Sequence, residues 1–313
     1  MDLLEELRRR VAQIDPHDHI AGIKAAIRHI ERAEAFLTRG RAEHDPDSFN
    51  DVIYRTNQAF EGMLKEAYSV LENKDASRLS ANEIEQHFLD TERFTGRVHG
   101  LFKSYRQQWR NPATHDHKLL FSEDEALLAI VNVSAFAVML LDQIVEIISF
   151  RRQRAATARK REELTAKLQS QGLSFVREVV EYIKYFLEFE INLSRDSRGA
   201  AELIGSLSGF LVGLNLGLDV SVEGGGVDHG FDLVVARAQQ SVAVEVKYGQ
   251  AKADYLDAMI GQLRAYVSAA KANSGILVIT PGTPLRMSST KVVDNPSLEL
   301  WLIRPEPKKG GSS

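Results

Sequence analysis

The apolar pattern of this chain changes once, near Ser194, and that change constrains the fold more than any other feature. Before it, apolar residues recur at heptad-like spacing, which indicates amphipathic helices, over Leu3–Val11, Ile20–Leu37, Ser48–Leu71, Ala81–Phe102 and Ala126–Phe150. After it come short runs rich in β-branched residues, which indicate strands. The sequence therefore predicts a multidomain chain with an all-α N-terminal bundle and a C-terminal α/β mixed sheet.

Breakers and charges mark the expected boundaries of the helical part. Asp15-Pro16, His44–Asp47 and Asn111-Pro112 interrupt the pattern, and the segment from Ser80 to Glu83 has the spacing of a capping box. Residues 151–170 are strongly charged and helix-prone, and Phe175–Leu193 reads as a further amphipathic helix. We therefore expect a helical domain over 1–150 and charged connecting helices over 151–195.

The C-terminal part is expected to form a small mixed sheet flanked by helices. A helix over 200–217 precedes the strands, and another over Lys252–Ala272 lies among them. The five expected strands are Leu218–Val222, Phe231–Ala236, Val242–Lys247, Ile276–Thr280 and Leu298–Ile303. The order α-β-β-β-α-β-β defines a domain over 196–306, followed by a tail over 307–313 that we expect to be disordered.

Composition limits the possible chemistry. The chain of 313 residues has no cysteine, which excludes disulfides and thiolate zinc sites, and its formal net charge of −4 requires any nucleic-acid surface to be local. The apolar stretch Ala126–Phe150 is long enough to span a membrane, but Asn132, Ser134, Asp142 and Glu146 interrupt it. We expect it to be a buried central helix of a cytoplasmic protein without membrane contact.

The predicted hairpin formed by residues 231–235 and 241–247 places unusual residues on one face. Side chains alternate along a strand, so Glu245 and Lys247 share the face opposite the apolar valines. If the turn centres between Ala238 and Gln239, facing residue numbers sum to 477, and Asp232 lies opposite Glu245. Two adjacent carboxylates repel unless a cation lies between them, and Mg²⁺ prefers oxygen ligands. A cross-strand surface ion pair is the alternative explanation.

The segment Gly226–Asp232, followed by Glu245-Val246-Lys247, resembles the PD-(D/E)XK nuclease superfamily, with an approach similar to Mrr-type restriction endonucleases. The resemblance implies a restriction endonuclease-like domain that hydrolyses DNA with Mg²⁺, for which Mn²⁺ can substitute, held by Asp232 and Glu245 and assisted by Lys247. Gln262 and Tyr266 match the Q-x-x-x-Y element of RecB-like members, and Glu202 matches a position from which the family often supplies another carboxylate. Asp228 is a turn residue or a second metal carboxylate, and His229 is a loop residue rather than a catalyst.

A second candidate site lies in the helical part, in the segment Trp109–His117. Arg110 and His115 have the types needed to cleave RNA without a metal, because a histidine can move a proton and an arginine can stabilise the phosphorane. With Asn111 between them they resemble the R-x4-6-H motif of the HEPN superfamily. The resemblance implies a homodimer, with Ala126–Phe150 a contributor to its interface, and an earlier helix carrying Glu61 and Lys65 that can face the motif. A capping arginine and a polar histidine are the alternative.

Three functions follow as hypotheses. The first is an Mg²⁺-dependent DNA endonuclease of prokaryotic antiviral or foreign-DNA defence. The second keeps the domains but places a metal-independent ribonuclease at Arg110 and His115. The third is a non-catalytic nucleic-acid-binding or scaffold protein.

A run of basic residues opens the connecting helices. It is either the solvated face of a helix or a patch that binds nucleic-acid phosphates. The run comprises Arg151, Arg152, Arg154, Arg159, Lys160 and Arg161.

Overall fold

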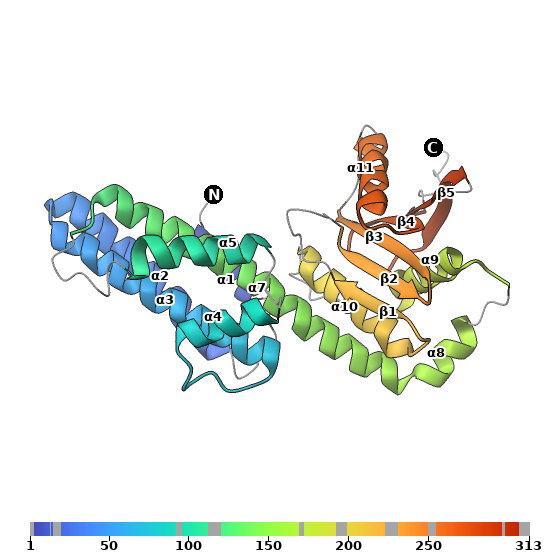
Figure 1. Cartoon of the computed structure of the whole chain (residues 1–313), viewed down its shortest axis with the longest axis horizontal. Helices are drawn as coiled ribbons and strands as arrows, with labels where there is room; N and C mark the ends of the chain where they lie inside the picture. Colours follow the sequence, from blue (N-terminus) through green and yellow to red (C-terminus); the bar gives the residue numbers. More distant parts are fainter. Residues whose placement is uncertain are drawn as a thin grey trace, which may run out of the picture. The chain divides into compact units, whose positions relative to one another are not determined.

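The computed structural model describes residues 3–12, 14, 20–91, 96–111, 120–168, 172–191, 199–222, 231–249, 255–295 and 298–306. The chain divides into two compact units, Met1–Val145 and Glu146–Ser313. We call them the helical unit and the sheet unit and describe each by itself (Figure 1).

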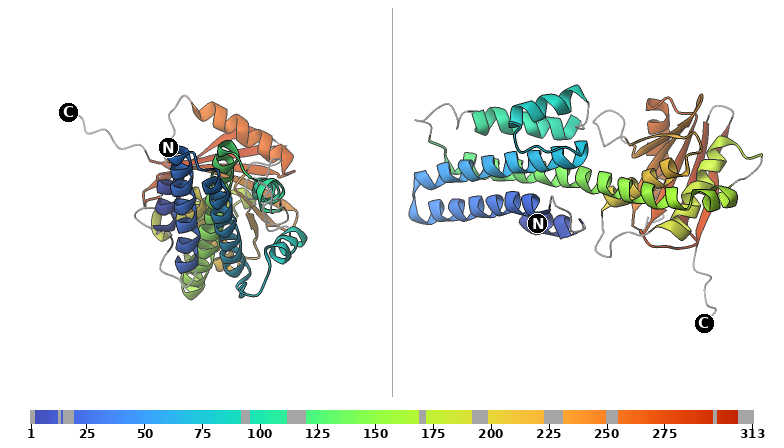
Figure 2. Two further views of the ribbon diagram at one scale, coloured as in Figure 1. Left: turned by 90° about the vertical axis from the view of Figure 1, so that its left-hand side faces the viewer. Right: turned by 90° about the horizontal axis from the view of Figure 1, so that it is seen from below.

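The helical unit is built from long helices. Figure 2 shows α2, α3 and the first part of α7 running side by side. Its described elements are α1 (Leu3–Ala12), α2 (Ile20–Glu43), α3 (Pro46–Glu72), α4 (Ala81–Asp90), α5 (Gly96–Tyr105), the π-helical turn η1 (Arg106–Arg110) and the first part of α7 (Glu123–Arg159). The core is rich in aromatic rings, and Phe60 packs against Phe102, Tyr105 and Phe136 at centroid distances of 4.6–5.0 Å. The predicted helical bundle is confirmed as an arrangement of helices.

Two helix ends follow from local chemistry. Ser80 caps α4 through a full capping box with Glu83, as the sequence predicts. Asp45 caps α3, and Pro46 occupies its first turn, where a missing backbone N–H costs nothing. The single helix expected over Ala81–Phe102 is wrong, because α4 ends at Asp90 and α5 begins at Gly96.

The helix α7 is the one long apolar helix among the described residues that could cross a membrane by length and composition. A soluble core helix passes the same test. In the helical unit its inward residues Phe136, Leu140 and Leu141 are fully buried, whereas Leu127, Leu128 and Val131 are exposed.

The sheet unit contains the rest of α7 and a six-stranded mixed sheet in the order β1-β2-β3-β4-β6-β5. Its helical elements are α8 (Arg161–Leu168), α9 (Phe175–Tyr185), the π-helical turn η2 (Phe186–Glu190), α10 (Ala200–Leu214) and α11 (Leu256–Ala269). Its strands are β1 (Asp219–Val222), β2 (Leu233–Arg237), β3 (Gln240–Tyr248), β4 (Ser274–Thr280), β5 (Met287–Asn295) and β6 (Leu298–Pro305). β1, β2 and β3 form an antiparallel meander, and β4 and β6 continue parallel to β3.

Two apolar layers lie on the two faces of the sheet. One contains residues of α8, α9 and α10 together with Val242, Val244 and Val246 of β3. The other contains Leu263 and Val267 of α11 together with Ala243. The alternation predicted for β3 is confirmed, and α11 lies on the face that also carries Glu245 and Lys247 (Figure 1).

Two expectations for this unit need correction. A sixth strand, β5, pairs antiparallel with β6, and its sequence MSSTKVVDN gives little apolar alternation from which to predict it. The segment 151–195, expected as connecting helices, belongs to the sheet unit, because Leu164, Leu168 and the apolar face of α9 are buried in the first apolar layer. The tail 307–313 lies outside the described residues.

Candidate metal and nuclease site

The hairpin β2–β3 sets the geometry of the leading candidate site. Leu233 pairs with Val244 and Val235 with Val242, so facing residue numbers sum to 477, as predicted. Ala238 adopts a left-handed φ of 55° in the turn, which closes the hairpin in two residues. The predicted register is therefore confirmed for the paired residues.

Asp232 stands one residue before β2 and is fixed to β3 from both its backbone and its side chain. Its backbone N–H donates to the carbonyl of Val244 at 3.2 Å, and its Oδ2 accepts from the backbone N–H of Val246 at 2.7 Å. The two contacts extend the ladder and hold the carboxylate against the strand that carries Glu245.

Glu245 is the most unusual side chain of the site. It is 4% exposed, and its Oε1 accepts a hydrogen bond from Lys247 Nζ. Its Oε2 is buried without a hydrogen-bond partner. A buried polar atom in this state loses its hydration with no compensation, so a hydrogen-bond donor or a cation at this oxygen would stabilise the site.

The pKa values of the two carboxyls reflect their burial and the neighbouring charges. Burial first, and then the neighbouring charge of Glu245, raise the pKa of Asp232 to about 7, against the opposing effects of the Val246 N–H and Lys247. Burial also raises the pKa of Glu245, while Lys247 lowers it. One lysine thus opposes a buried and a half-buried carboxyl, and an added cation would stabilise both in the charged form.

The helix α11 runs beside the candidate site. A Cβ on Gly275 would touch Val267 and Leu263, and Gly275 pairs with Ala243. Glu245 lies two residues further along β3, about 6.6 Å, which corresponds to roughly four helix residues. The helix α11 lies in the chain between the parallel strands β3 and β4 and therefore runs antiparallel to β3. Moving from Ala243 to Glu245 along β3 thus corresponds to moving back along α11, and Glu245 lies level with helix positions around 260–262.

Gln262 and Tyr266 lie on α11 at the predicted four-residue spacing and are hydrogen-bonded to each other. Gln262 is exposed, and Tyr266 is half-buried. Among the described residues their side chains are hydrogen-bonded only to each other. The structure therefore places them on the predicted face without joining them to Asp232, Glu245 or Lys247.

Glu202 lies in the first turn of α10, on the other face of the sheet from α11. It is 2% exposed, and its Oε1 accepts from Arg152 at 2.8 Å. The sequence analysis predicted Glu202 as a metal carboxylate and Arg152 as a phosphate contact, and it missed that the two form an ion pair with each other.

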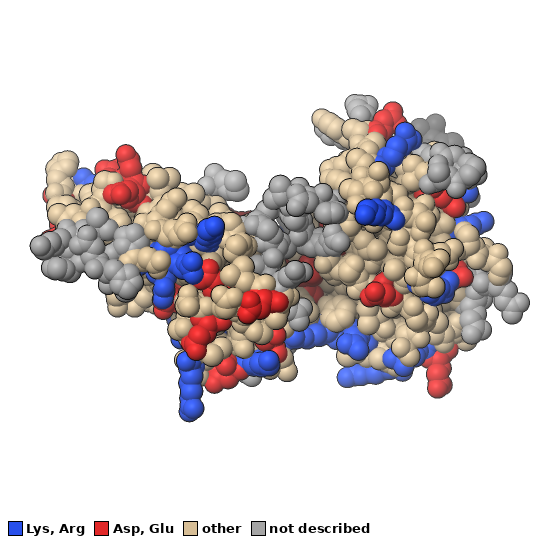
Figure 3. All heavy atoms as spheres, viewed as in Figure 1, with Lys and Arg blue, Asp and Glu red and all other residues tan. Residues whose placement is uncertain are grey.

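The basic run follows the second part of α7 and α8. In Figure 3, Lys and Arg side chains gather along this stretch, which includes the exposed Arg151, Arg152 and Arg154. Glycines of α10 allow the close approach of α7, since a Cβ on Gly205 would lie 2.2 Å from the carbonyl oxygen of Glu146. The run therefore lies beyond α10, on the side of the sheet opposite to Glu245 and Lys247.

The second candidate site is described only in part. Arg110 ends η1 and forms an ion pair with Glu61 of α3 at 2.9 Å, so the expectation that Glu61 faces this motif is confirmed. Asn111 follows and donates its backbone N–H to the carbonyl of Arg106. His115 lies outside the described residues, as do Asp228 and His229 of the other site.

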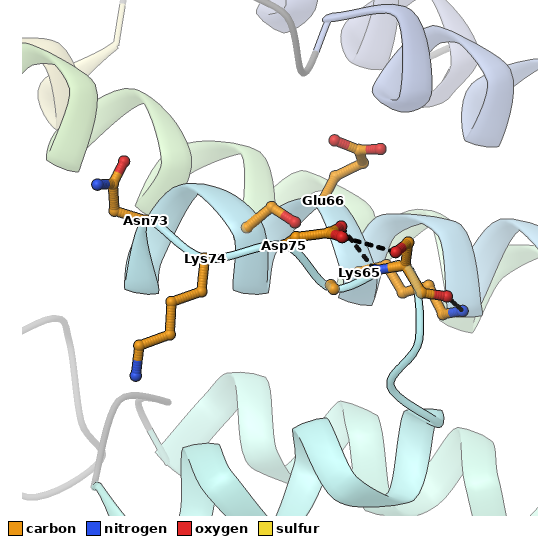
Figure 4. Close-up of a pocket in the computed structure, with 8 residues that line it drawn as sticks. Lys65, Glu66, Asn73, Lys74 and Asp75 are labelled. Carbon is orange, nitrogen blue, oxygen red and sulfur yellow. Dashed lines mark hydrogen bonds between the residues drawn. The ribbon is translucent and has the colours of Figure 1, made fainter.

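Lys65 was expected near the same motif, but its Nζ reaches the carbonyl of Ser77 at 3.5 Å. It lines a pocket of about 520 Å³ at the end of α3, together with Lys74 and Asp75 (Figure 4). Asp75 is already engaged by the backbone and hydroxyl of Ser77. The pocket therefore presents mixed charges and no clear ligand preference.

The carboxylates of the hairpin are the candidate metal ligands. Within the described ranges, no group of three or more His, Cys, Asp or Glu side chains could hold an ion. The pair Asp232 and Glu245 nevertheless fits Mg²⁺, which often binds through one or two protein carboxylates and water, and the unpartnered Oε2 of Glu245 offers a free ligand atom. Comparison with family models, curated proteins and solved structures found no match to this chain.

Proposed function

We propose that this protein is an Mg²⁺-dependent nuclease that hydrolyses DNA phosphodiester bonds at the hairpin β2–β3, with the restriction endonuclease-like architecture of the PD-(D/E)XK superfamily in its sheet unit. One observation carries the proposal. A buried glutamate with an unpartnered oxygen lies on one strand face beside a half-buried carboxyl and a lysine. That combination is costly in a purely structural role.

The residues have distinct roles in this proposal. Asp232 and Glu245 would hold the ion, and Mn²⁺ can replace Mg²⁺. A bound divalent ion would polarise the phosphoryl group and lower the pKa of a water molecule. Lys247, which is 33% exposed, reaches solvent beside the carboxylates and can donate hydrogen bonds to the phosphoryl oxygens as their charge grows. The Val246 N–H keeps Asp232 oriented.

The assay that tests this function compares linear DNA, supercoiled DNA and total RNA, each with Mg²⁺, Mn²⁺ or EDTA. We expect metal-dependent DNA cleavage by the wild type and none by Glu245→Gln, which keeps the size of the side chain. If no DNA lane changes with metal, the proposal fails.

A second function is favoured by the ion pair between Glu61 and Arg110, which holds the guanidinium of the R-x4-H motif. In this alternative a HEPN-like helical unit cleaves RNA without a metal, through Arg110 and His115, as a homodimer. Its signature is RNA cleavage that survives EDTA and disappears in His115→Ala.

A third possibility is a non-catalytic protein that grips nucleic acid or a partner through the same surfaces. Unchanged DNA affinity in Lys247→Ala, with no turnover by the wild type under any divalent metal, would identify it. A cytoplasmic location and a role in prokaryotic defence against foreign DNA belong to the proposal as its biological setting.

A further inference from the structure

Cationic side chains of α2 and α3 converge in the helical unit, and neither candidate site uses them. The two helices pack antiparallel, and their contacts define a register. Gly22 approaches Glu66, and Gly62 approaches Ala26, so facing residue numbers sum to 88. By this register Arg55 of α3 stands beside Ala33, within one helical turn of Arg32 and His29 on α2.

Three arginines neighbour His29 in the fold, since Arg28 and Arg32 stand one and three residues from it on α2 and the register sets Arg55 of α3 within about one helical turn. Burial lowers the pKa of His29, and the positive charges of Arg55, Arg32 and Arg28 lower it further. Arg28 and Arg32 are exposed, while His29 and Arg55 are half-buried. The four residues thus form one group of neighbouring cationic and imidazole side chains, in which Arg28 also borders a pocket between α1 and α2 that is lined by Lys24 and Glu31. We call the group the α2–α3 cationic cluster.

This cluster differs from many arginines of the helical unit in what balances its charge. Many of them form ion pairs with carboxylates, as at Arg8–Glu31, Arg41–Glu123, Arg106–Glu85 and Arg110–Glu61. Among the ion pairs of the described residues, none involves Arg28, Arg32 or Arg55. Arg55 is held instead by neutral groups, because its Nη1 donates to Gln58 and its guanidinium lies 5.6 Å from the Tyr54 ring centroid.

Two polar atoms at the centre of the cluster also lack partners in the described structure. His29 Nδ1 and Arg55 Nε are both buried without a hydrogen bond. The Nε–H of an arginine is an obligatory donor, and such a group is expected to find an acceptor when buried. A phosphate oxygen would supply one and would neutralise the convergent positive charge, since planar guanidinium groups match phosphate geometry.

We propose that Arg28, His29, Arg32 and Arg55 form a phosphate-binding site in the helical unit, separate from the hairpin β2–β3 and independent of the nuclease proposal. The ligand is a phosphoryl oxyanion, carried by a nucleotide or small phosphate compound or by the backbone of a nucleic acid. Arg28 and Arg32 meet the phosphate at the exposed rim, and Arg55 Nε–H and His29 Nδ1, which are buried in the free protein, donate to its oxygens after the rim side chains turn aside.

The test is calorimetric titration of the full-length protein in EDTA with inorganic phosphate in one arm and a short single-stranded DNA in the other. We expect binding by the wild type and a loss of about ten- to hundredfold in affinity in Arg55→Gln, the range expected for a charge-assisted hydrogen bond. The double variant R28Q/R32Q, altered only at exposed positions, should weaken binding while keeping the wild-type melting temperature. Arg41→Gln removes a paired, exposed arginine of the same unit and should bind as the wild type does.

The arms separate the sources of the phosphate. Similar affinity per phosphate in both arms indicates a single phosphate group, and binding only of the DNA, with a steep salt dependence, indicates a polynucleotide backbone. Either supports the proposed site if R28Q/R32Q weakens it. The absence of binding to both probes, or equal affinities in the wild type and R28Q/R32Q, would overturn it.

Discussion

The two candidate sites differ in how their charges are balanced. At the hairpin, the buried Glu245 and the half-buried Asp232 lie beside one lysine, and one oxygen of Glu245 has no partner. At Arg110, the cation is paired with Glu61, and both side chains are partly exposed, at 25% and 43%. The second arrangement is satisfied without a ligand, whereas the first is not. The hairpin therefore gives the stronger structural indication of an ion-binding site.

The strongest challenge to this comparison is removal of the unpartnered carboxylate. Glu245→Gln should reduce metal-dependent DNA cleavage by about a thousandfold or more, because it removes one of two charged metal ligands. Single-turnover cleavage rates at saturating Mg²⁺ measure the effect. Glu202→Gln is an informative companion: if it abolishes cleavage while the fold persists, α10 contributes to the site and the carboxylate pair is incomplete.

Lys247 should act on the reaction rather than on the ion. Lys247→Ala is expected to lower the cleavage rate about a hundredfold, as for loss of one donor to a developing charge, and to leave metal affinity nearly unchanged or slightly increased. Lys291→Ala is the matched control, because Lys291 is equally exposed, at 33%, and also pairs with a glutamate. Equal rates in the two variants would remove Lys247 from the mechanism.

The pH dependence of stability separates the two sites without an activity assay. Because the pKa of Asp232 is raised to about 7 in the folded state, folding favours its protonated form. In metal-free buffer this contribution is full below pH 4 and is lost as pH rises through about 7. A shift of three pKa units corresponds to about 4 kcal/mol. Because the side chain of Asp232 is partly exposed, we expect about half of that, a loss of about 2 kcal/mol in the free energy of unfolding.

Denaturant unfolding of the wild type and Asp232→Asn in EDTA, from pH 4 to pH 8, measures this contribution. The variant should lose most of the decline that the wild type shows between pH 4 and pH 7. Identical profiles for the two proteins would mean that Asp232 does not titrate in this range.

The smallest effect is expected at the paired site. Glu61→Gln should lower the free energy of unfolding by about 0–1 kcal/mol, as for other solvent-exposed ion pairs, and should not change metal-dependent DNA cleavage. Thermal unfolding and the DNA assay check both parts. Loss of EDTA-resistant RNA cleavage in this variant would instead support the ribonuclease alternative and place Glu61 in its function.

Sequence reasoning predicted the hairpin well because its evidence is local. Alternation of Val242, Val244 and Val246 fixes the faces of β3, and the turn position fixes the register. The bond from the Val246 N–H to Asp232 could not be predicted, because every residue carries a backbone N–H and no side chain marks this one. The cluster around His29 was missed for a similar reason, since its members come from two helices whose register only packing reveals.

Long-range pairing explains the remaining differences. The partner of Glu202 is Arg152, fifty residues earlier in the chain. The family resemblance that suggested a role for Glu202 does not indicate this pairing. β5 was missed because an edge strand with polar residues needs its neighbour β6 to be identified. Helices with strong apolar periodicity, such as α2 and α3, were predicted, although α2 extends beyond the expected Leu37 to Glu43.

Calorimetric titration of Mg²⁺ and Mn²⁺ into the metal-free protein, with Glu245→Gln as the matched variant, tests the central claim most directly. The account predicts divalent-ion binding by the wild type, accompanied by proton release near neutral pH, and a loss of that binding in Glu245→Gln. A wild type that binds neither ion, or a variant that binds as tightly as the wild type, would contradict it.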